Sequence, residues 1–314
     1  MAITELMRLW LRYFLILFTC FLVALVPRIH GETFRIATFN VEGYLLATNG
    51  TRHPKTPDSR SKVRESVLAL RPDILALQEI GGPEALQELQ DSLKAEGLAL
   101  PYSEHVSGFD PTIQVAVLSK FPFAARSSHT NETFLLHGRR LRTSRGFGEV
   151  EIKVTTNYSF TLLVAHLKSK LASNQMDEGE LRLEEAKLLR EKVDAVLKSN
   201  PDADLVVAGD LNDTKGSLPV RTLMGRAKTR LTDTRPAERN GDSQIHEGNH
   251  EPRVITWTHY YAREDSYTRV DYILLSSRMA RNWVKEESYV LSSPNWGMGS
   301  DHRPVVATFR SRDR

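Results

Sequence analysis

The chain has 314 residues, of which 40% are hydrophobic and 26% are charged, and its formal net charge is +3. This composition is that of an ordinary globular protein rather than a disordered chain, and the length permits one large domain or two small ones. The small net charge argues neither for nor against a polyanionic partner, so any such attraction must come from local clusters of charge.

Residues 1–31 differ in composition from the rest of the chain. Arg8 and Arg12 precede an apolar run at 13–26, which is shorter than the roughly 20 residues that a membrane-spanning helix needs. A basic stretch followed by a short apolar stretch is typical of a secretory signal peptide. We therefore expect residues 1–31 to be a signal peptide and the protein to be secreted or periplasmic. The alternative is an uncleaved segment that anchors the protein to a membrane.

Cys20 is the only cysteine and lies inside this segment. Cleavage would leave residues 32–314 without a thiol, which excludes disulfide bonds and a cysteine nucleophile from the mature chain. A chain of this length can bury a core large enough to fold without such cross-links. Residues 32–314 contain no repeat, low-complexity tract or linker-like stretch, so we expect them to form one domain.

The predicted elements begin with alternating apolar and polar residues at 33–40, which are typical of a strand. The polar stretch at 45–59 is expected to be a loop. Apolar side chains spaced as on a helix face follow at 62–70, and a short apolar run at 73–77 predicts a buried strand. Residues 83–98 predict a second helix, with a proline in its first turn.

The same alternation continues through the rest of the domain. Further strands are expected, in chain order, at 112–118, 148–154, 160–165, 205–208, 254–258, 270–274 and 305–309. The longest helix is predicted at 178–198, and the polar stretch at 233–252 is expected to be a long loop. The close succession of strands at 148–154 and 160–165 indicates antiparallel pairing. About nine strands and three main helices predict a mixed α/β domain and argue against a doubly wound parallel sheet.

Polar side chains stand at the ends of several predicted strands. They are Asn40, Glu79, His166, Asp210, Asn212, Asp271, Asp301 and His302. Each has an ordinary structural explanation by itself, as a turn former or as a polar group that needs a buried partner. Antiparallel pairing brings the starts of some strands and the ends of others to one rim of a sheet. One rim can therefore gather the whole set, which predicts a functional site.

The chemistry of this set narrows its function. It contains four carboxylates, two carboxamides and two imidazoles, and oxygen ligands without cysteine suit Mg²⁺, with Mn²⁺ or Ca²⁺ as alternatives, rather than structural zinc. Carboxylates and imidazoles can activate water and protonate a leaving oxygen. The carboxamide of Asn212 can donate to a charged phosphoryl oxygen. Together these groups predict a metal-dependent hydrolase of phosphate esters.

Eight motifs surround these residues. They are TFNVEG (38–43), PDILALQEI (72–80), VAVLSKFP (115–122), SRGFGEVEI (144–152), VAHLKSK (164–170), VVAGDLND (206–213), RVDYILL (269–275) and GSDHRPV (299–305). In order and spacing they resemble the endonuclease/exonuclease/phosphatase superfamily, which includes pancreatic deoxyribonuclease and the abasic-site endonucleases. The resemblance implies a four-layer α/β sandwich over residues 32–314, with two mixed, mainly antiparallel sheets flanked by helices.

The resemblance also implies which residues bind the metal and the attacking water. Glu79 would be the principal metal ligand, helped by Asn40 and Asp301. Asp210 would orient or deprotonate the water. Asn212 would hold a phosphate oxygen of the substrate.

The remaining implied roles concern proton transfer and phosphate binding. His302 would act on the phosphate or as a general base, with Asp271 fixing its tautomer. His166 would serve the leaving group, and Arg145 would contact the substrate phosphate. Lys168, which lies near the predicted rim, is a further candidate for binding the phosphate. The partner that polarises His166 is left open among three residues, Tyr102, Glu104 and Asp110.

The fold does not determine which phosphate ester is the substrate. Lys168 and Lys170 lie near the predicted rim, the run 139–142 contains three arginines, and such charges suit a polyanionic backbone. The aromatic stretch 257–261, with Trp257, His259, Tyr260 and Tyr261, could stack on a base or sugar or could pack within the domain. We therefore expect an endonuclease acting on nucleic acid, as a monomer without a protein partner. The alternatives are a phospholipid phosphodiesterase or phosphatase, which would act on lipid or small phosphate esters, and a non-catalytic phosphate-binding module.

Overall fold

The computed structural model describes residues 32–171, 176–239 and 255–311, and the chain from Thr33 onward belongs to one compact unit. The predicted signal peptide, with Cys20, lies outside the described residues, as do residues 240–252 of the predicted long loop. Among the described residues, no helix combines the length and the apolar character that crossing a membrane requires.

The first sheet has seven strands in the order β12-β16-β17-β1-β2-β4-β3. Their bounds are β1 (Thr33–Tyr44), β2 (Ile74–Ile80), β3 (Tyr102–Val106), β4 (Gln114–Ser119), β12 (Ala237–Arg239), β16 (Trp283–Leu291) and β17 (Val305–Arg310). β1 runs parallel to β2 and antiparallel to β17, so the first and last strands of the domain are neighbours. The β12–β16 pair is also parallel, and the other neighbouring pairs of this sheet are antiparallel.

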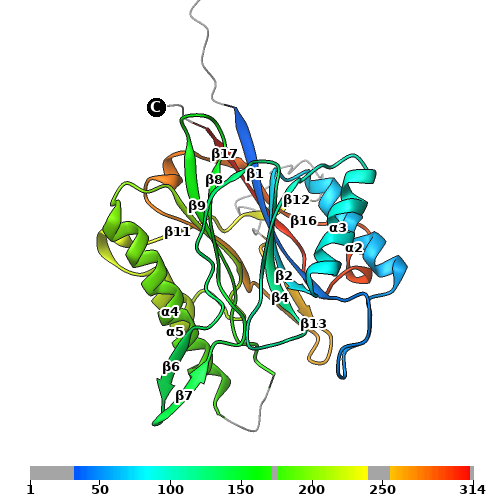
Figure 1. The fold of residues 1–314 in the computed structure, drawn as a ribbon, viewed down its shortest axis with the longest axis horizontal. Helices are drawn as coiled ribbons and strands as arrows, with labels where there is room; N and C mark the ends of the chain where they lie inside the picture. Colours follow the sequence, from blue (N-terminus) through cyan, green and yellow to red (C-terminus); the bar gives the residue numbers. More distant parts are fainter. Residues whose placement is uncertain (1–31, 172–175, 240–254, 312–314) are drawn as a thin grey trace, which may run out of the picture. The chain divides into compact units, whose positions relative to one another are not determined.

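The second sheet has six strands in the order β11-β15-β10-β9-β8-β5. Their bounds are β5 (Phe123–Arg126), β8 (Gly148–Lys153), β9 (Ser159–His166), β10 (Leu205–Asp210), β11 (Thr232–Asp233) and β15 (Asp271–Leu275). Only β9 and β10 are parallel neighbours here. Two separate hairpins are formed by β6 (Thr133–Leu136) with β7 (Arg139–Arg142) and by β13 (His259–Tyr261) with β14 (Ser266–Thr268). Both hairpins extend at the lower end of the domain in Figure 1.

Helices cover the outer face of each sheet (Figure 1). α2 (Pro57–Leu70) and α3 (Pro83–Ala95) pack on the first sheet, and α4 (Glu178–Ser199) and α5 (Leu218–Met224) pack on the second. A third apolar cluster fills the space between the sheets, with Phe34, Val164 and Phe309 among its buried side chains. These layers confirm the predicted four-layer sandwich with mixed, mainly antiparallel sheets. Three 3₁₀ turns complete the described elements, at Ala227–Thr229, Met279–Arg281 and Trp296–Met298.

Local sequence explains where the first helix begins and ends. Thr56 caps α2 by accepting a hydrogen bond from the Ser59 backbone, and Pro57 occupies the first helical turn, where a missing N–H costs nothing. At the other end Arg71 adopts a left-handed conformation with φ 46° before Pro72. The helix therefore starts five residues before the predicted 62, and the predicted loop at 45–59 was wrong for its last residues.

Several sequence expectations differ from the structure. The strand predicted at 254–258 was wrong for its described part, because residues 255–258 have no regular structure and β13 begins at His259. The predicted loop at 233–252 contains the short strand β12. The described residues form seventeen strands and four α-helices, more than the expected number. The missed strands are mostly short or lie in exposed hairpins such as β6–β7, where apolar alternation is not required because neither face is fully covered.

Candidate active site

The predicted site residues meet at one end of the sandwich. In the second sheet, Asp210 at the end of β10 pairs in register with His166 of β9 on one side and with Asp271 of β15 on the other. The first sheet contributes Asn40 from β1 and Glu79 from β2. Asp301 and His302 precede β17. The site therefore takes side chains from both sheets, at the carboxyl ends of their parallel strand pairs.

The buried carboxylate of Asp210 lies at the centre of this set. Its Oδ1 accepts a hydrogen bond from the backbone N–H of Asn212, at 2.8 Å, and its Oδ2 accepts one from Asn40 Nδ2, at 3.0 Å. The Nε2 atoms of His166 and His302 lie 3.5 Å and 3.8 Å from Oδ2. Burial raises the pKa of Asp210 to about 7, although the charge on His302 opposes this shift. A carboxyl group with such a pKa can exchange a proton near neutral pH.

Gly209 allows this carboxylate to sit beside His166. It has a φ of 145°, and a Cβ at this position would lie 1.9 Å from the Ala165 carbonyl oxygen. No side chain fits at that distance, so only glycine lets β10 approach β9 so closely. The glycine in the VVAGDLND motif therefore sets the position of the neighbouring Asp210.

His302 is held in one orientation by Asp271. Its Nδ1 lies 2.8 Å from Asp271 Oδ2, which leaves Nε2 directed at Asp210 and Asp301, each 3.8 Å away. Burial lowers the pKa of His302, but the carboxylates of Asp271 and Asp210 outweigh burial and raise it to about 10. The imidazole is therefore protonated in the metal-free protein at neutral pH. The predicted contact between His302 and Asp271 is present in the structure.

Glu79 reaches the rim because β2 is irregular at this residue. Its φ of 60° is left-handed, and the pairing of β2 with β4 shifts register between Gln78 and Ile80. Such irregularities redirect a side chain and are frequent beside active sites. The carboxylate Oε1 lies 3.3 Å from Asn40 Nδ2.

Asn40 is oriented as a link between two carboxylates. Its Nδ2 donates to Asp210 and Glu79, whereas its Oδ1 accepts from the backbone N–H of Glu42 at 3.0 Å. The oxygen that would bind a metal is therefore engaged by the backbone in this arrangement. A direct metal contact by Asn40 stays a prediction, and the geometry shows it as a group that positions the carboxylates.

Glu42 joins the site without having been predicted. Its Oε2 accepts a hydrogen bond from the Asp301 backbone N–H at 3.1 Å. Burial and the negative charges of Asp301 and Glu79 raise the pKa of Glu42, whereas the ammonium group of Lys55, 3.8 Å from Oε2, opposes this shift. The carboxylates of this cluster therefore repel one another. A cluster of mutually repelling oxygen ligands fits a hard divalent cation such as Mg²⁺. The signal in the sequence was its place two residues after Asn40 in the first motif.

His166 contacts none of the three partners that the sequence left open. Tyr102 packs against Phe123, Glu104 pairs with Arg126, and Asp110 pairs with Arg145. The Nε2 of His166 instead lies near Asp210, and also 3.8 Å from Glu79 Oε1. Its Nδ1 has no hydrogen-bond partner in the part of the chain that the structure describes. Burial lowers the pKa of His166 well below its ordinary value, so this imidazole is neutral.

The two predicted phosphate-binding cations have different surroundings. Arg145 is buried, with its guanidinium 3.8 Å from Asp110, and its charge contributes to the lowered pKa of His166. Lys168 donates through Nζ to the carbonyl oxygens of Ser169 and Leu171 in its own loop. Lys170, rather than Lys168, is the lysine that lines the pocket.

Helix α4 anchors the two loops that carry these cations. Glu185 is buried and accepts hydrogen bonds from the backbone N–H groups of Ser144, at 2.7 Å, and Lys168, at 2.6 Å. One turn earlier, Arg182 donates to Asp213 and to the Lys168 carbonyl oxygen. Neither residue was singled out from the sequence, because both look like ordinary polar residues of a surface helix.

The residues surround a pocket of about 350 Å³. Its lining comprises Glu79, Ser169, Lys170, Leu171, Asp210, Asn212, His259, Tyr261, Glu264, Ser266, Thr268, Val270, Asp301 and His302. The hairpin β13–β14 forms one wall. Of the predicted stacking residues, His259 and Tyr261 face the pocket, whereas Trp257 packs against Arg303, Trp296 and Tyr267.

Comparison with known proteins places this geometry in context. The sequence model of the Endonuclease/Exonuclease/phosphatase family matches residues 37–302. No curated protein matches the chain.

Solved structures similar to the chain include three from different organisms. The human Nocturnin catalytic domain with bound sulfate is 16% identical, with a TM-score of 0.60, and the match covers 90% of this chain and 98% of that one. Sphingomyelinase C from Streptomyces griseocarneus is 19% identical, with a TM-score of 0.57 and coverage of 89% and 100%. Truncated Caenorhabditis elegans TDP2 is 15% identical, with a TM-score of 0.56 and coverage of 89% and 98%. At these identities the likeness concerns the fold.

Proposed function

The chain belongs to the Endonuclease/Exonuclease/phosphatase family and is a hydrolase of phosphate esters, and we propose that it cleaves the phosphodiester bonds of nucleic acid by in-line attack of water. One observation carries the proposal. Glu79, Asp210 and His302, which Asp271 orients, converge on a single pocket, where an acidic cluster suited to a divalent cation lies beside a carboxyl group that can exchange a proton.

The residues divide the chemistry among them. Glu79 and Asp301 would hold Mg²⁺, with Mn²⁺ or Ca²⁺ as substitutes, and the bound cation supplies a Lewis acid for a phosphoryl oxygen. Asp210, with its raised pKa, can take the proton of the attacking water. The protonated Nε2 of His302 faces the pocket and can stabilise the charge of the phosphate. Asn212 donates one N–H to the Leu167 carbonyl oxygen and retains a second for a phosphoryl oxygen.

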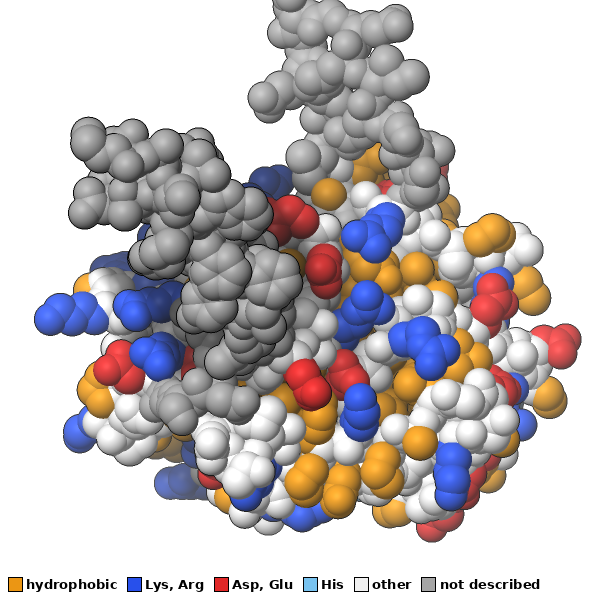
Figure 2. All heavy atoms as spheres, turned by 90° about the horizontal axis from the view of Figure 1, so that it is seen from above, with side chains coloured by type: hydrophobic (Ala, Val, Ile, Leu, Met, Phe, Trp, Pro, Cys, Tyr) orange, Lys and Arg blue, Asp and Glu red, His pale blue; other side chains and the backbone are white. Residues whose placement is uncertain are grey.

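Cations at the site end of the domain support a polyanionic substrate. Arg52 lies 4.0 Å from Glu79 and 3.8 Å from Asp110 Oδ2, and Arg145 lies 3.8 Å from the same oxygen of Asp110. The hairpin β6–β7 presents the exposed arginines 139, 140 and 142 at the same end. Figure 2 shows the opposite end of the domain, where cationic, anionic and apolar side chains are interspersed on the visible face. The cations beside the site favour a phosphate backbone.

A phospholipid headgroup is the second candidate substrate. Leu171 lines the pocket and is 64% exposed, and Tyr261 faces the same space. An exposed apolar side chain at a pocket rim suits a lipid more than a nucleotide.

We further propose that residues 1–31 direct the protein out of the cytoplasm, as a secreted or periplasmic enzyme.

A substrate panel tests the function. The purified protein is incubated with double-stranded DNA, single-stranded DNA, RNA, sphingomyelin and inositol phosphates, each with Mg²⁺, Mn²⁺ or Ca²⁺ and with EDTA, beside the variant His302→Ala. Metal-dependent cleavage of a nucleic acid supports the proposal. Cleavage of sphingomyelin alone would move the substrate to the lipid class. Absence of hydrolysis across the whole panel would refute the enzymatic function.

A further inference from the structure

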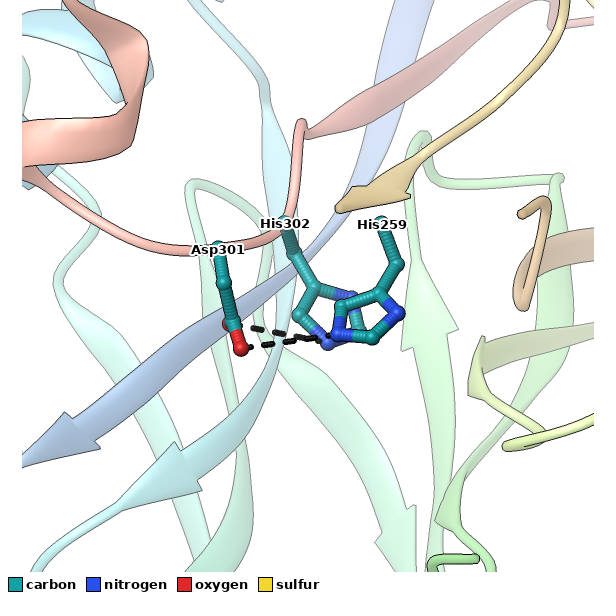
Figure 3. Close-up of side chains that lie close together, drawn as sticks. All are labelled: His259, Asp301 and His302. Atoms are coloured by element: carbon teal, nitrogen blue, oxygen red, sulfur yellow. Dashed lines mark ion pairs between the residues drawn. The ribbon is translucent and has the colours of Figure 1, made fainter. Parts of the chain in front are cut away.

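Two histidines and one aspartate converge at the rim of the pocket, from segments far apart in the chain (Figure 3). His259 of β13 and His302 before β17 form an isolated antiparallel bridge. Flanking hydrogen bonds run from Tyr260 N to the Asp301 carbonyl oxygen and from Arg303 N to the Thr258 carbonyl oxygen. This pattern makes the histidines a non-hydrogen-bonded pair, the position at which cross-strand side chains approach most closely.

The ligand atoms of the three side chains are close to the spacing that a metal requires. His259 Nε2 lies 3.5 Å from Asp301 Oδ2, and His302 Nε2 lies 3.8 Å from Asp301 Oδ1. One ligand atom of each residue lies within 4.8 Å of the others. Bonds of 2.0–2.2 Å in tetrahedral geometry separate ligand atoms by about 3.4 Å. Both carboxylate–imidazole separations, which involve different oxygens of Asp301, are within about half an ångström of that value.

Their surroundings prepare the ligands. Asp271 engages Nδ1 of His302 and directs Nε2 toward the shared space, where a metal would replace the proton of Nε2. A carboxylate behind a metal-binding histidine orients the ring in this way. The two imidazole rings lie with centroids 4.5 Å apart and planes inclined by 38°. The carboxylate of Asp301 is two-fifths exposed, so a fourth position remains accessible to water.

This donor set differs from that of the acidic cluster. Two imidazoles with one carboxylate suit Zn²⁺ or Co²⁺, whereas Mg²⁺ prefers oxygen ligands. The acidic cluster of Glu79, Asp301 and Glu42 offers only oxygen atoms. The two sets share Asp301, so occupation of one affects the other.

We propose that His259, Asp301 and His302 form a second metal site that binds Zn²⁺ or Co²⁺ and thereby inhibits hydrolysis. Nε2 of His302 cannot face the phosphate while it is a ligand, and Asp301 is drawn away from the cation beside Glu79. The inhibition rests on the proposed function, whereas metal binding at this site does not.

A titration with Co²⁺ alone tests the binding. The full-length chain, freed of metal by chelation and of any affinity tag, is titrated while visible absorption is recorded, since tetrahedral Co²⁺ absorbs strongly there. The variants are His259→Ala and His259→Asn, with His137→Ala as the matched control because His137 is exposed and pairs with Glu180 outside the site. We expect one Co²⁺ per wild-type or control chain and affinity at least about tenfold weaker in both His259 variants. Equal affinity in all four proteins, with unfolding temperatures that show intact folds, would overturn the site.

Zn²⁺ in the presence of excess Mg²⁺ tests the inhibition. Each protein's rate with Zn²⁺ is divided by its own rate without Zn²⁺, so a changed basal rate in a variant does not affect the comparison. We expect the ratio to fall for the wild type and the control and to stay higher for both His259 variants. An unchanged wild-type ratio at Zn²⁺ concentrations that fill the site would overturn inhibition. If the wild-type protein has no activity with Mg²⁺ even without Zn²⁺, the proposed function is refuted. The Co²⁺ titration would still show whether the second metal site exists.

Discussion

Replacement of Glu185 by glutamine would test how helix α4 supports the active site. The carboxylate accepts one hydrogen bond through each of its two oxygens, from Ser144 N and from Lys168 N. These two backbone groups belong to the loops that carry Arg145 and Lys168. Glutamine has nearly the same shape but only one acceptor oxygen, and its NH₂ group would face the second backbone N–H.

The structure sets the size of the effect. A hydrogen bond to a charged group contributes about 1.5–3 kcal/mol, against about 1 kcal/mol for a neutral pair, and a buried unsatisfied donor costs about 1–3 kcal/mol. Burial raises the pKa of Glu185, which shows that the buried charge itself is unfavourable. Its removal therefore offsets part of the decrease in the free energy of unfolding. We therefore expect the free energy of unfolding to fall by about 2 kcal/mol, equivalent to a decrease of about 3–4 °C in Tm for a domain of about 280 residues.

Thermal unfolding and amide hydrogen exchange measure the outcome. Glu185→Gln should lower the Tm, accelerate exchange at Ser144 and Lys168, and raise KM more than it lowers kcat. Glu191→Gln is the control, because Glu191 lies on the same helix with an exposed side chain, where such a change alters stability by at most about 0.5 kcal/mol. Equal Tm values for the two variants, or unchanged exchange at the two amides, would refute the anchoring role.

Four further outcomes are expected. His302→Ala should lower kcat by at least about 10²-fold, the usual scale for loss of acid–base catalysis, and kcat within a few-fold of wild type would remove it from the mechanism. Glu79→Gln should raise the Mg²⁺ concentration needed for half-maximal activity, measured by adding Mg²⁺ back after EDTA treatment; an unchanged requirement would exclude Glu79 as the main ligand. Because burial raises the pKa of Asp210 from 3.8 to about 7, its contribution to the stability of the metal-free fold is complete below pH 3.8 and is lost as the pH rises through 7. Asp210→Asn should then raise the Tm of the EDTA-treated protein at pH 8 but not at pH 4, and a lower Tm at pH 8 would contradict this sign. Gly209→Ala should destabilise the protein by more than about 3 kcal/mol in urea unfolding, since its Cβ meets a carbonyl oxygen, and near-normal stability would show that β10 can move.

The apolar pattern of the sequence predicted the central strands and helices, because elements that are buried in the core must consist mainly of apolar residues. Strands such as β4 and β10 are buried along their whole length, so each is a continuous apolar run bounded by polar residues. The family match confirms the resemblance that the motifs suggested. The polar residues at the ends of these strands could therefore be read from the sequence, and the structure brings their side chains together at one site.

Other features depend on contacts between distant segments. Nothing in the sequence distinguishes Glu185 from the other glutamates of its helix. Only the packing of α4 on the two loops makes it an anchor. Likewise, His259 meets His302 through a bridge that spans more than forty residues of sequence. The sequence offered no neighbour of His166 in β10, whereas the parallel pairing of β9 with β10 places Asp210 beside it, 3.5 Å from Nε2.

The pairing of β1 with β17 has a consequence for how activity develops during refolding. These strands lie at opposite ends of the domain sequence yet are adjacent in the first sheet, and contacts of such long range form slowly. Asn40 and the Asp301–His302 segment are joined to them, so the site is complete only when this long-range pairing has formed. Enzymatic activity should therefore return later than secondary structure when the denatured protein is diluted into buffer, and the delay would report the closure of a single pair of strands.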